Sequence, residues 1–296
     1  MKSAKPRAYW PCLLILLQSA LYGLGDPISK TAFDVMPVYS LLSIRYLLAL
    51  AVLMLFAGKR IVKGLRESSC RDWLLPSLCM GGGYLTNNIA LGMTAATSVA
   101  FLRSLSTVMT PLLALVIYRR RFHRRHIPVQ LLVVVGLYLL CGLGGLSGFG
   151  MGEVFALLSA LLMAGSLVFG EKALDRVDPM TLTACQTAIS AAMATVCAPL
   201  FNGGWHLQLI TGQVGAIILY LAVCCTVAGY ALQNAALGKI SSRTVALLQC
   251  ICPVMTALFS RVLLGERLSA AGLVGAAVIL LCVILEAAME DEPLQI

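Results

Sequence analysis

Residues 75–121 read LPSLCMGGGYLTNNIALGMTAATSVAFLRSLSTVMTPLLALVIYRRR, and residues 221–267 read LAVCCTVAGYALQNAALGKISSRTVALLQCICPVMTALFSRVLLGER. At this offset of 146 residues, 17 of the 47 aligned positions are identical without a gap. Shared Leu and Val could reflect composition alone, so the polar and glycine matches carry the argument. These matches are Gly83-Tyr84 with Gly229-Tyr230, Asn88 with Asn234, Gly92 with Gly238, and Val108-Met109-Thr110 with Val254-Met255-Thr256.

The repeat extends toward the start of the chain at a slightly smaller offset. Near an offset of 142 residues, Gly23 aligns with Gly165, and the same offset aligns a lysine pair and a proline pair. A unit of nearly half the chain is therefore predicted to occur twice. The aligned lysines are Lys30 and Lys172, and the aligned prolines are Pro37 and Pro179.

The composition predicts that this unit lies in a lipid bilayer. Of 296 residues, 59% are hydrophobic and 12% are charged, whereas a soluble domain has roughly 45 to 50% apolar residues. Because a bilayer core takes about 20 apolar residues per helix, the apolar runs predict ten transmembrane helices. We expect them at residues 9–32, 38–57, 73–92, 97–118, 127–146, 152–170, 180–201, 213–236, 244–264 and 269–288.

The positive charges favour an even number of helices. When alternate loops are assigned to opposite sides, 17 of the 22 Lys and Arg residues lie on one side together with both termini. Excess Lys and Arg mark the cytoplasmic side, so both termini are predicted to be cytoplasmic. The basic run at residues 119–126 is then interpreted as a topology anchor at the lipid headgroups rather than a nucleic-acid site.

Five helices per repeat is an odd number, so the second copy must enter the bilayer from the opposite side. The predicted fold is all-α and integral to the membrane, with ten helices in two inverted five-helix repeats. We expect the first repeat at 1–146, a junction at 147–151, and the second repeat at 152–296 with a short acidic tail. Inverted repeats are common in secondary transporters, where a site near the midplane opens alternately to each side.

The second repeat carries a more specific pattern. PVMTAL at 253–258 followed by LGERL at 264–268, with Pro37 and Arg45 earlier in the chain, resembles the EamA-type branch of the drug/metabolite transporter superfamily. Pro253 and Glu266 are the motif residues, although the first repeat has Arg120 where Glu266 stands. The resemblance implies a ten-helix exporter or permease with a central cavity between the halves, and no particular substrate.

Charged residues inside the predicted helices are the first site candidates. A charge at the bilayer centre costs roughly 3 kcal/mol on insertion scales, so it should face the protein interior or a cavity. Arg103 shares one helical face with Thr107 and Thr110, and we weigh a role as ligand for an anionic solute against an ion pair with Asp26. Asp26 precedes Pro27, which is expected to break the helix, and could couple transport to protons or pair with an arginine. Arg45 is expected to be structural.

Polar side chains at equivalent positions of the two repeats are the second set. Amides in membrane helices either contact a solute or join neighbouring helices, and both interpretations stay open for this set. The candidates for the cavity lining are Gln18, Tyr22, Tyr84, Asn87, Asn88, Tyr230, Gln233, Asn234 and Gln249.

The function predicted from these features is a secondary-active carrier, an exporter or permease, for a small metabolite, amino acid or drug in the cell membrane. A channel or facilitator is the alternative, and a membrane-embedded enzyme is a weaker one because HExxH and GxSxG motifs are absent from the sequence. The expected partners are lipid, a small solute and a coupling ion such as the proton. We expect no nucleic acid, cofactor or metal, since the eleven cysteines lie mostly in apolar runs.

Overall fold

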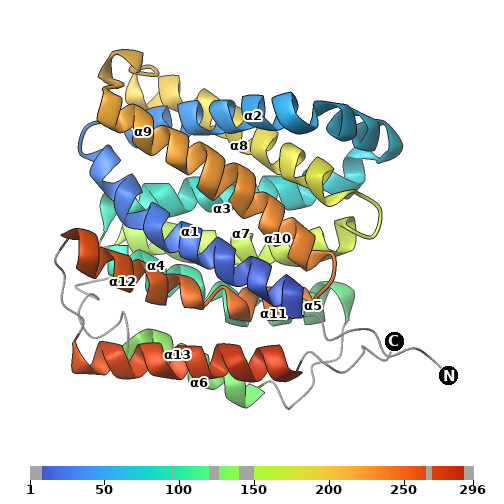
Figure 1. The fold of residues 1–296 in the computed structure, drawn as a ribbon, viewed down its shortest axis with the longest axis vertical. Coiled ribbons are helices and arrows are strands. Elements are labelled where there is room, and N and C mark those ends of the chain that lie inside the picture. Colours follow the sequence, from blue (N-terminus) through green and yellow to red (C-terminus); the bar gives the residue numbers. More distant parts are fainter. Residues whose placement is uncertain (1–8, 95, 120–126, 140–149, 265–268, 290–296) are drawn as a thin grey trace.

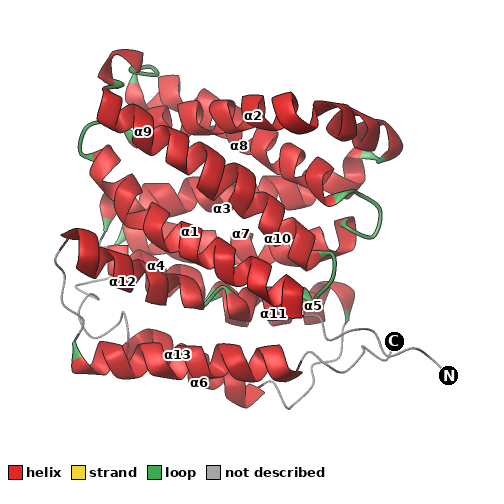
Figure 2. Ribbon diagram, viewed as in Figure 1, coloured by secondary structure: helices red, strands yellow, loops and turns green. Residues whose placement is uncertain are grey.

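The computed structural model describes residues 9–94, 96–119, 127–139, 150–264 and 269–289. Within these ranges the chain is helical and forms no β-strand (Figure 2). The helices are α1 (Tyr9–Phe33), α2 (Val38–Glu67), α3 (Cys70–Met93), α4 (Ala96–Ser104), α5 (Ser106–Tyr118), α6 (Ile127–Leu137), α7 (Met151–Ala173), α8 (Pro179–Asn202), the short η3 (Leu207–Leu209), α9 (Gly212–Tyr220), the π-helix η4 (Leu221–Ala228), α10 (Gly229–Leu237), α11 (Ser242–Leu248), α12 (Ile251–Leu264) and α13 (Ala270–Met289).

Several of these helices are long and apolar enough to cross a bilayer. The described part of the chain has seven such spans. Three of them join shorter helices end to end, namely α4 with α5, α9 with η4 and α10, and α11 with α12. The shorter apolar helices α6 and α13 and the more polar α3 lie beside them. The 30 residues of α2 span about 45 Å at 1.5 Å per residue, which exceeds a hydrocarbon core of about 30 Å. The helix ends at Glu67, ten residues past the end predicted from the sequence, so it is longer than the hydrocarbon core requires.

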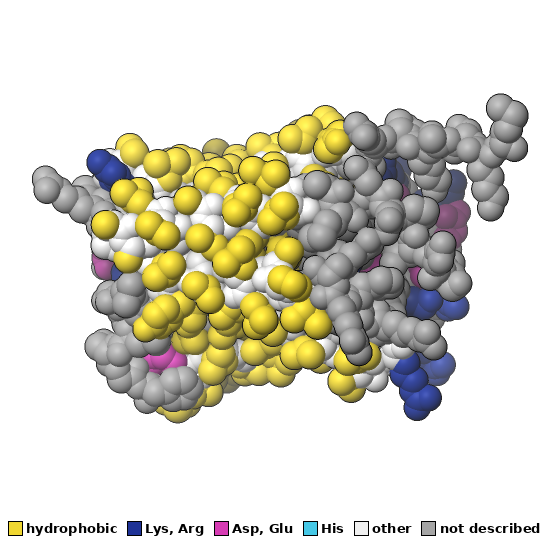
Figure 3. All heavy atoms as spheres, turned by 90° about the horizontal axis from the view of Figure 1, so that it is seen from below, with side chains coloured by type: hydrophobic (Ala, Val, Ile, Leu, Met, Phe, Trp, Pro, Cys, Tyr) yellow, Lys and Arg dark blue, Asp and Glu magenta, His cyan; other side chains and the backbone are white. Residues whose placement is uncertain are grey.

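The outer surface has the chemistry of a lipid-facing protein. Leu55 and Phe56 are 79% and 83% exposed, and apolar side chains form a broad belt on the face shown in Figure 3. Lys and Arg gather mainly at one end of this belt (Figure 3). A belt of exposed apolar side chains of this breadth is typical of a surface that faces lipid.

The two repeats pack into each other. The first helix of each repeat contacts the third and fourth helices of the other, since α1 packs on α10 and α12 while α7 packs on α3 and on α4 with α5. The second helices α2 and α8 pack on one another, and α6 packs on α13 (Figure 1). This exchange places α1, α3, α7 and α10 between the two outer pairs (Figure 1).

The helix starts and the proline in α1 show how local sequence sets these elements. Asp178 caps α8, because its carboxylate accepts hydrogen bonds from the Met180 and Thr181 backbone N–H groups at 3.0 and 3.3 Å. The expected break at Pro27 is wrong: α1 runs through it to Phe33. Pro27 removes one hydrogen bond to the carbonyl four residues earlier, and the packing of α1 against α10 and α12 keeps the helix continuous.

Candidate functional site

Two helices are interrupted near equivalent positions of the repeat, two residues out of register at the offset of 146. Leu105 separates α4 from α5, and Gln249 with Cys250 separates α11 from α12. At the offset of 146 residues, Arg103 aligns with Gln249, so each interruption lies beside this pair. Irregular backbone at membrane depth is tolerated where it is buried in protein or lines a cavity.

The interruption in the first repeat carries a charge pair. Arg103 Nη2 donates to Asp26 Oδ2 of α1 at 3.0 Å, and the two side chains are 15% and 19% exposed. Arg103 also lies 3.5 Å from Cys252 Sγ in the first turn of α12. Pairing lowers the cost of each charge in a medium of low polarity, and here it links α1 with α4.

Amide side chains form a hydrogen-bonded cluster at the interruption in the second repeat. Gln233 Oε1 of α10 accepts from Gln18 Nε2 of α1 and from Gln249 Nε2, both at 2.9 Å. Gln249 Nε2 also donates to Gln18 Oε1 at 3.1 Å. The buried Gln18 and Gln233 and the partly buried Gln249 thus share hydrogen bonds without a net charge.

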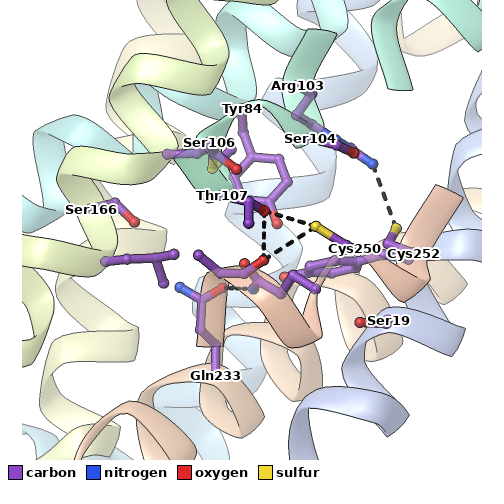
Figure 4. A pocket seen from close by; sticks show the side chains of 15 residues that line it. Ser19, Tyr84, Arg103, Ser104, Ser106, Thr107, Ser166, Gln233, Cys250 and Cys252 are labelled. Atoms are coloured by element: carbon purple, nitrogen blue, oxygen red, sulfur yellow. Dashed lines mark hydrogen bonds between the residues drawn. The ribbon is translucent and has the colours of Figure 1, made fainter. Parts of the chain in front are cut away.

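A cavity of about 60 Å³ lies between the two interruptions. Thr107 Oγ1 lies 2.8 Å from Cys250 Sγ and donates to the Ala246 carbonyl at 2.9 Å, across the wall drawn in Figure 4. Ser19 is buried, and its hydroxyl has no hydrogen-bond partner among the described residues. The lining residues are Ser19, Tyr22, Tyr84, Arg103, Ser104, Ser106, Thr107, Met163, Ser166, Leu167, Gln233, Ala246, Gln249, Cys250 and Cys252.

A smaller cavity of about 20 Å³ lies beside the first one. Tyr22, Tyr84 and Arg103 line both, so they form the partition. Tyr84 stacks on Tyr230 with ring centroids 5.3 Å apart and meets Tyr22 edge-on at 6.0 Å. The lining residues of the smaller cavity are Tyr22, Gly25, Asp26, Ser29, Arg45, Tyr84, Asn87, Asn88, Arg103, Leu221 and Cys225.

The comparison with known families decides what class of protein carries these cavities. The sequence model of the EamA-like transporter family matches residues 9–142 and again 150–286. The chain belongs to the EamA-like transporter family. It is a multi-pass membrane protein, and membership points to transport of a small molecule rather than to catalysis.

Two proteins that are similar to most of this EamA-like chain are named as a transporter and as an efflux pump. A protein of Archaeoglobus fulgidus named an uncharacterized transporter is 26% identical over 275 residues, which cover 92% of this chain and 83% of the relative. A Salmonella typhimurium protein named "Probable amino-acid metabolite efflux pump" is 26% identical over 285 residues, covering 90% of this chain and 91% of that protein. A solved structure described as "Crystal structure of protein" has a TM-score of 0.79 over 94% of this chain and 97% of that one, at 18% identity, and shows the shared fold.

Most of the residues predicted to line a cavity of this EamA-like protein do line one of the two cavities, and the others lie elsewhere. Thr110 donates to the Ser106 carbonyl, Tyr230 lies behind Tyr84, and Asn234 donates to Thr183 and Gln186 at 3.0 and 2.7 Å. These three therefore support the walls from outside the cavities. Gln18 lies at the amide cluster, behind Gln233 and Gln249.

The remaining predictions concern the motif residues, of which Pro253 lies outside the two cavities, and Arg45, which lines the smaller one. Pro253 lies in the first turn of α12 and has no backbone N–H to donate to the Gln249 carbonyl. That carbonyl accepts from the Cys252 N–H at 2.9 Å instead, which matches the interruption there. Glu266 lies outside the described residues. Arg45 makes no ion pair with Asp26, and its partner is Thr226. Within the described chain, no group of three or more His, Cys, Asp and Glu side chains could hold a metal.

Sequence reasoning missed the small polar residues. Ser104 and Ser106 flank the interruption at Leu105, and Ser19 follows Gln18 directly. Ser166 lines the same cavity from α7. Hydroxyl side chains on one face of an apolar helix indicate a polar protein interior, so these serines could have been recognised. The amide and charged side chains were the more obvious candidates.

Proposed function

We propose that the protein is a secondary carrier that moves a small metabolite through the cavity between its two repeats by alternating access. The observation that carries the proposal is the polar lining at two helix interruptions near equivalent positions of the repeats, reached by α1 from one repeat and by α7 from the other. Interrupted helices around a central site between repeats are a recurring design of secondary transporters.

The proposed topology has ten membrane spans, in two inverted repeats at 1–146 and 152–296, with the junction at 147–151 and both termini in the cytoplasm. The exchange of contacts between repeats supports a two-fold relation, because α1 and α7 have equivalent partners. The odd number of helices per repeat then requires opposite orientations in the bilayer.

The cavity size supports a closed state of this carrier. Pockets for drug-sized ligands measure about 300–1,000 Å³, whereas the larger cavity here measures about 60 Å³. A metabolite can enter only after the repeats move apart on one side. The Tyr22, Tyr84 and Arg103 partition would move with them.

The name of the Salmonella relative makes amino-acid metabolites the first solutes to test. We propose to screen them by thermal shift on the purified protein beside nucleosides, organic acids and cationic drugs, because a ligand that prefers the folded state raises its melting temperature. Uptake of the best stabiliser into proteoliposomes is expected to saturate with concentration. Uptake that rises linearly with concentration would indicate a channel instead.

Asp26 is the proposed coupling group. Its carboxylate lines the smaller cavity and shares a hydrogen bond with Arg103, so protonation would release the arginine. Asp26→Asn leaves Arg103 unpaired and lowers the melting temperature, so it is assayed well below that temperature, where it is expected to keep solute exchange while losing the response of net transport to a pH gradient. If net transport by the unmodified protein ignores pH and membrane potential, Asp26 has no coupling role.

A further inference from the structure

Arg45 is a buried cation to which the proposed transport mechanism assigns no role. It lies in α2 and is 4% exposed. Its Nε donates to Thr226 Oγ1 of η4 at 2.9 Å, and its guanidinium carbon lies 5.3 Å from the Tyr46 ring centroid. These contacts hold the side chain in place but supply no negative charge.

The charges around the smaller cavity do not balance. Two arginines, Arg45 and Arg103, line it, and Asp26 is the carboxylate that lines it among the described residues. Asp26 is already paired with Arg103, and no described carboxylate lies within 4.0 Å of Arg45. The cavity wall therefore has a net charge of one positive unit at a place where an unneutralised charge is costly.

Thr226 cannot satisfy the rest of the guanidinium. The π-helical turn of η4 directs its hydroxyl proton to the Leu221 carbonyl five residues earlier, at 3.0 Å, so the same oxygen accepts from Arg45 Nε. A guanidinium has five N–H donors. Among the described residues, the four N–H groups on Nη1 and Nη2 of Arg45 make no hydrogen bond to an acceptor.

The fold does not need a cation at this position. At the offset of 142 residues, Arg45 aligns with Thr187 of α8, whose hydroxyl donates to the Thr183 carbonyl at 2.8 Å. The second repeat thus builds the same helix with a neutral residue. A charge kept at only one of two equivalent positions, beside a void, points to a ligand of opposite charge.

We propose that Arg45 anchors an anion-binding subsite in the smaller cavity, which the Arg103–Asp26 pair also lines, and that this subsite takes either a carboxylate of the transported solute or a small free anion. The solute arm rests on the proposed carrier function, and the free-anion arm does not. The cavity of about 20 Å³ has room for one water-sized group. It therefore fits chloride or the end of one carboxylate in the closed state.

The test measures the melting temperature of the intact protein in detergent, with sodium chloride or sodium acetate replacing sodium isethionate, which has no carboxylate, at constant ionic strength. The wild type is expected to gain a few degrees in a saturable way, since a ligand that binds the folded state stabilises it. Arg45→Gln is expected to lose this gain. The matched control Arg60→Gln, in the same helix but at the exposed basic end, is expected to keep it.

A second comparison separates a binding role from a structural one. In isethionate alone, Arg45→Gln is expected to melt at or above the wild type, because it removes a buried charge without a counterion. A melting temperature well below that of the wild type in every salt, or an anion response that survives in Arg45→Gln, overturns the proposal. The absence of any anion response in the wild type overturns it as well.

The two sources of anion differ in further readouts. A response to chloride but not to acetate assigns the subsite to a free anion, and Arg45→Lys should then retain it because the point charge remains. A response to acetate that Arg45→Lys weakens assigns it to a carboxylate, which a guanidinium binds through two parallel hydrogen bonds. Anion binding without any solute transport would count against the carrier proposal and leave this subsite standing.

Discussion

In the first repeat the helix interruption lies beside Arg103, and in the second it includes the aligned Gln249. Arg103 holds an ion pair with Asp26, whereas Gln249 shares neutral hydrogen bonds with Gln18 and Gln233. The interruption is therefore repeated and the charge is not. The comparison teaches that both halves share the backbone arrangement, while the buried charged groups for which we propose roles in coupling and anion binding gather in one of them.

The largest expected effect comes from making the first repeat resemble the second. Arg103→Gln leaves Asp26 without its partner in a largely buried place, and removal of one member of a buried pair costs about 3 kcal/mol or more. The variant is expected to melt well below the wild type in detergent and to lose solute uptake.

The double variant Asp26→Asn with Arg103→Gln serves as the control, because it removes both charges. It is expected to recover much of the melting temperature without recovering uptake. If the double variant is as unstable as the single one, the ion pair does not explain the loss.

The second prediction compares two aligned glycines. A Cβ at Gly23 would lie 2.9 Å from the Met255 carbonyl carbon and from the Thr256 nitrogen, which are backbone atoms, whereas one at Gly165 would lie 3.2 Å from Cys79 Sγ. Overpacking costs roughly 1–3 kcal/mol. Gly23→Ala is expected to lower thermal stability clearly and Gly165→Ala only slightly, and equal effects would contradict the unequal packing of α1 and α7.

The third prediction concerns the amide cluster. Gln233→Leu removes the shared acceptor of two hydrogen bonds, and such bonds in membrane proteins are worth about 0.6–2 kcal/mol. A loss of this size is expected in thermal or denaturant unfolding. Gln130→Leu in α6 is the control, since Gln130 Nε2 is buried without a partner among the described residues, and it should cost nothing.

The smallest expected effect is at a helix start. Asp178 caps α8 and pairs with Arg60, whereas α2, the aligned helix, begins at Pro37 without a side-chain cap. Loss of an N-cap costs about 1 kcal/mol, so Asp178→Ala should lower stability by about that much. Asp178→Asn should retain most of it, because Asn also caps helices.

Asp178 also predicts the sign of a pH effect. Burial alone would raise its pKa, but the Arg60 guanidinium and two backbone N–H groups outweigh burial and lower the pKa. A carboxyl with a depressed pKa stabilises the fold above its unfolded pKa, and this contribution disappears as the pH falls through the folded value. The difference in melting temperature between wild type and Asp178→Ala should therefore shrink in acid.

Much of this architecture could be predicted from the sequence, because hydrophobic length and repeat symmetry are local or pairwise signals. The approximate helix ranges followed from these signals, whereas the family resemblance came from the motifs at 253–258 and 264–268. The interruption at Leu105 did not, since Thr107 stands where the second repeat has Pro253, and no residue there breaks a helix by itself. The partner of Asp26 also required the structure, because the sequence alone left Arg45 and Arg103 equally placed to pair with it.

The central claim is that one cavity between two repeats opens alternately to each side, and solute counterflow tests it most directly. Proteoliposomes are loaded with the unlabelled solute found by thermal shift, and uptake of the labelled solute is followed. The account predicts a saturable uptake that internal solute accelerates to a transient overshoot, and no overshoot for Arg103→Gln. Uptake that is linear in concentration and indifferent to internal solute would contradict it.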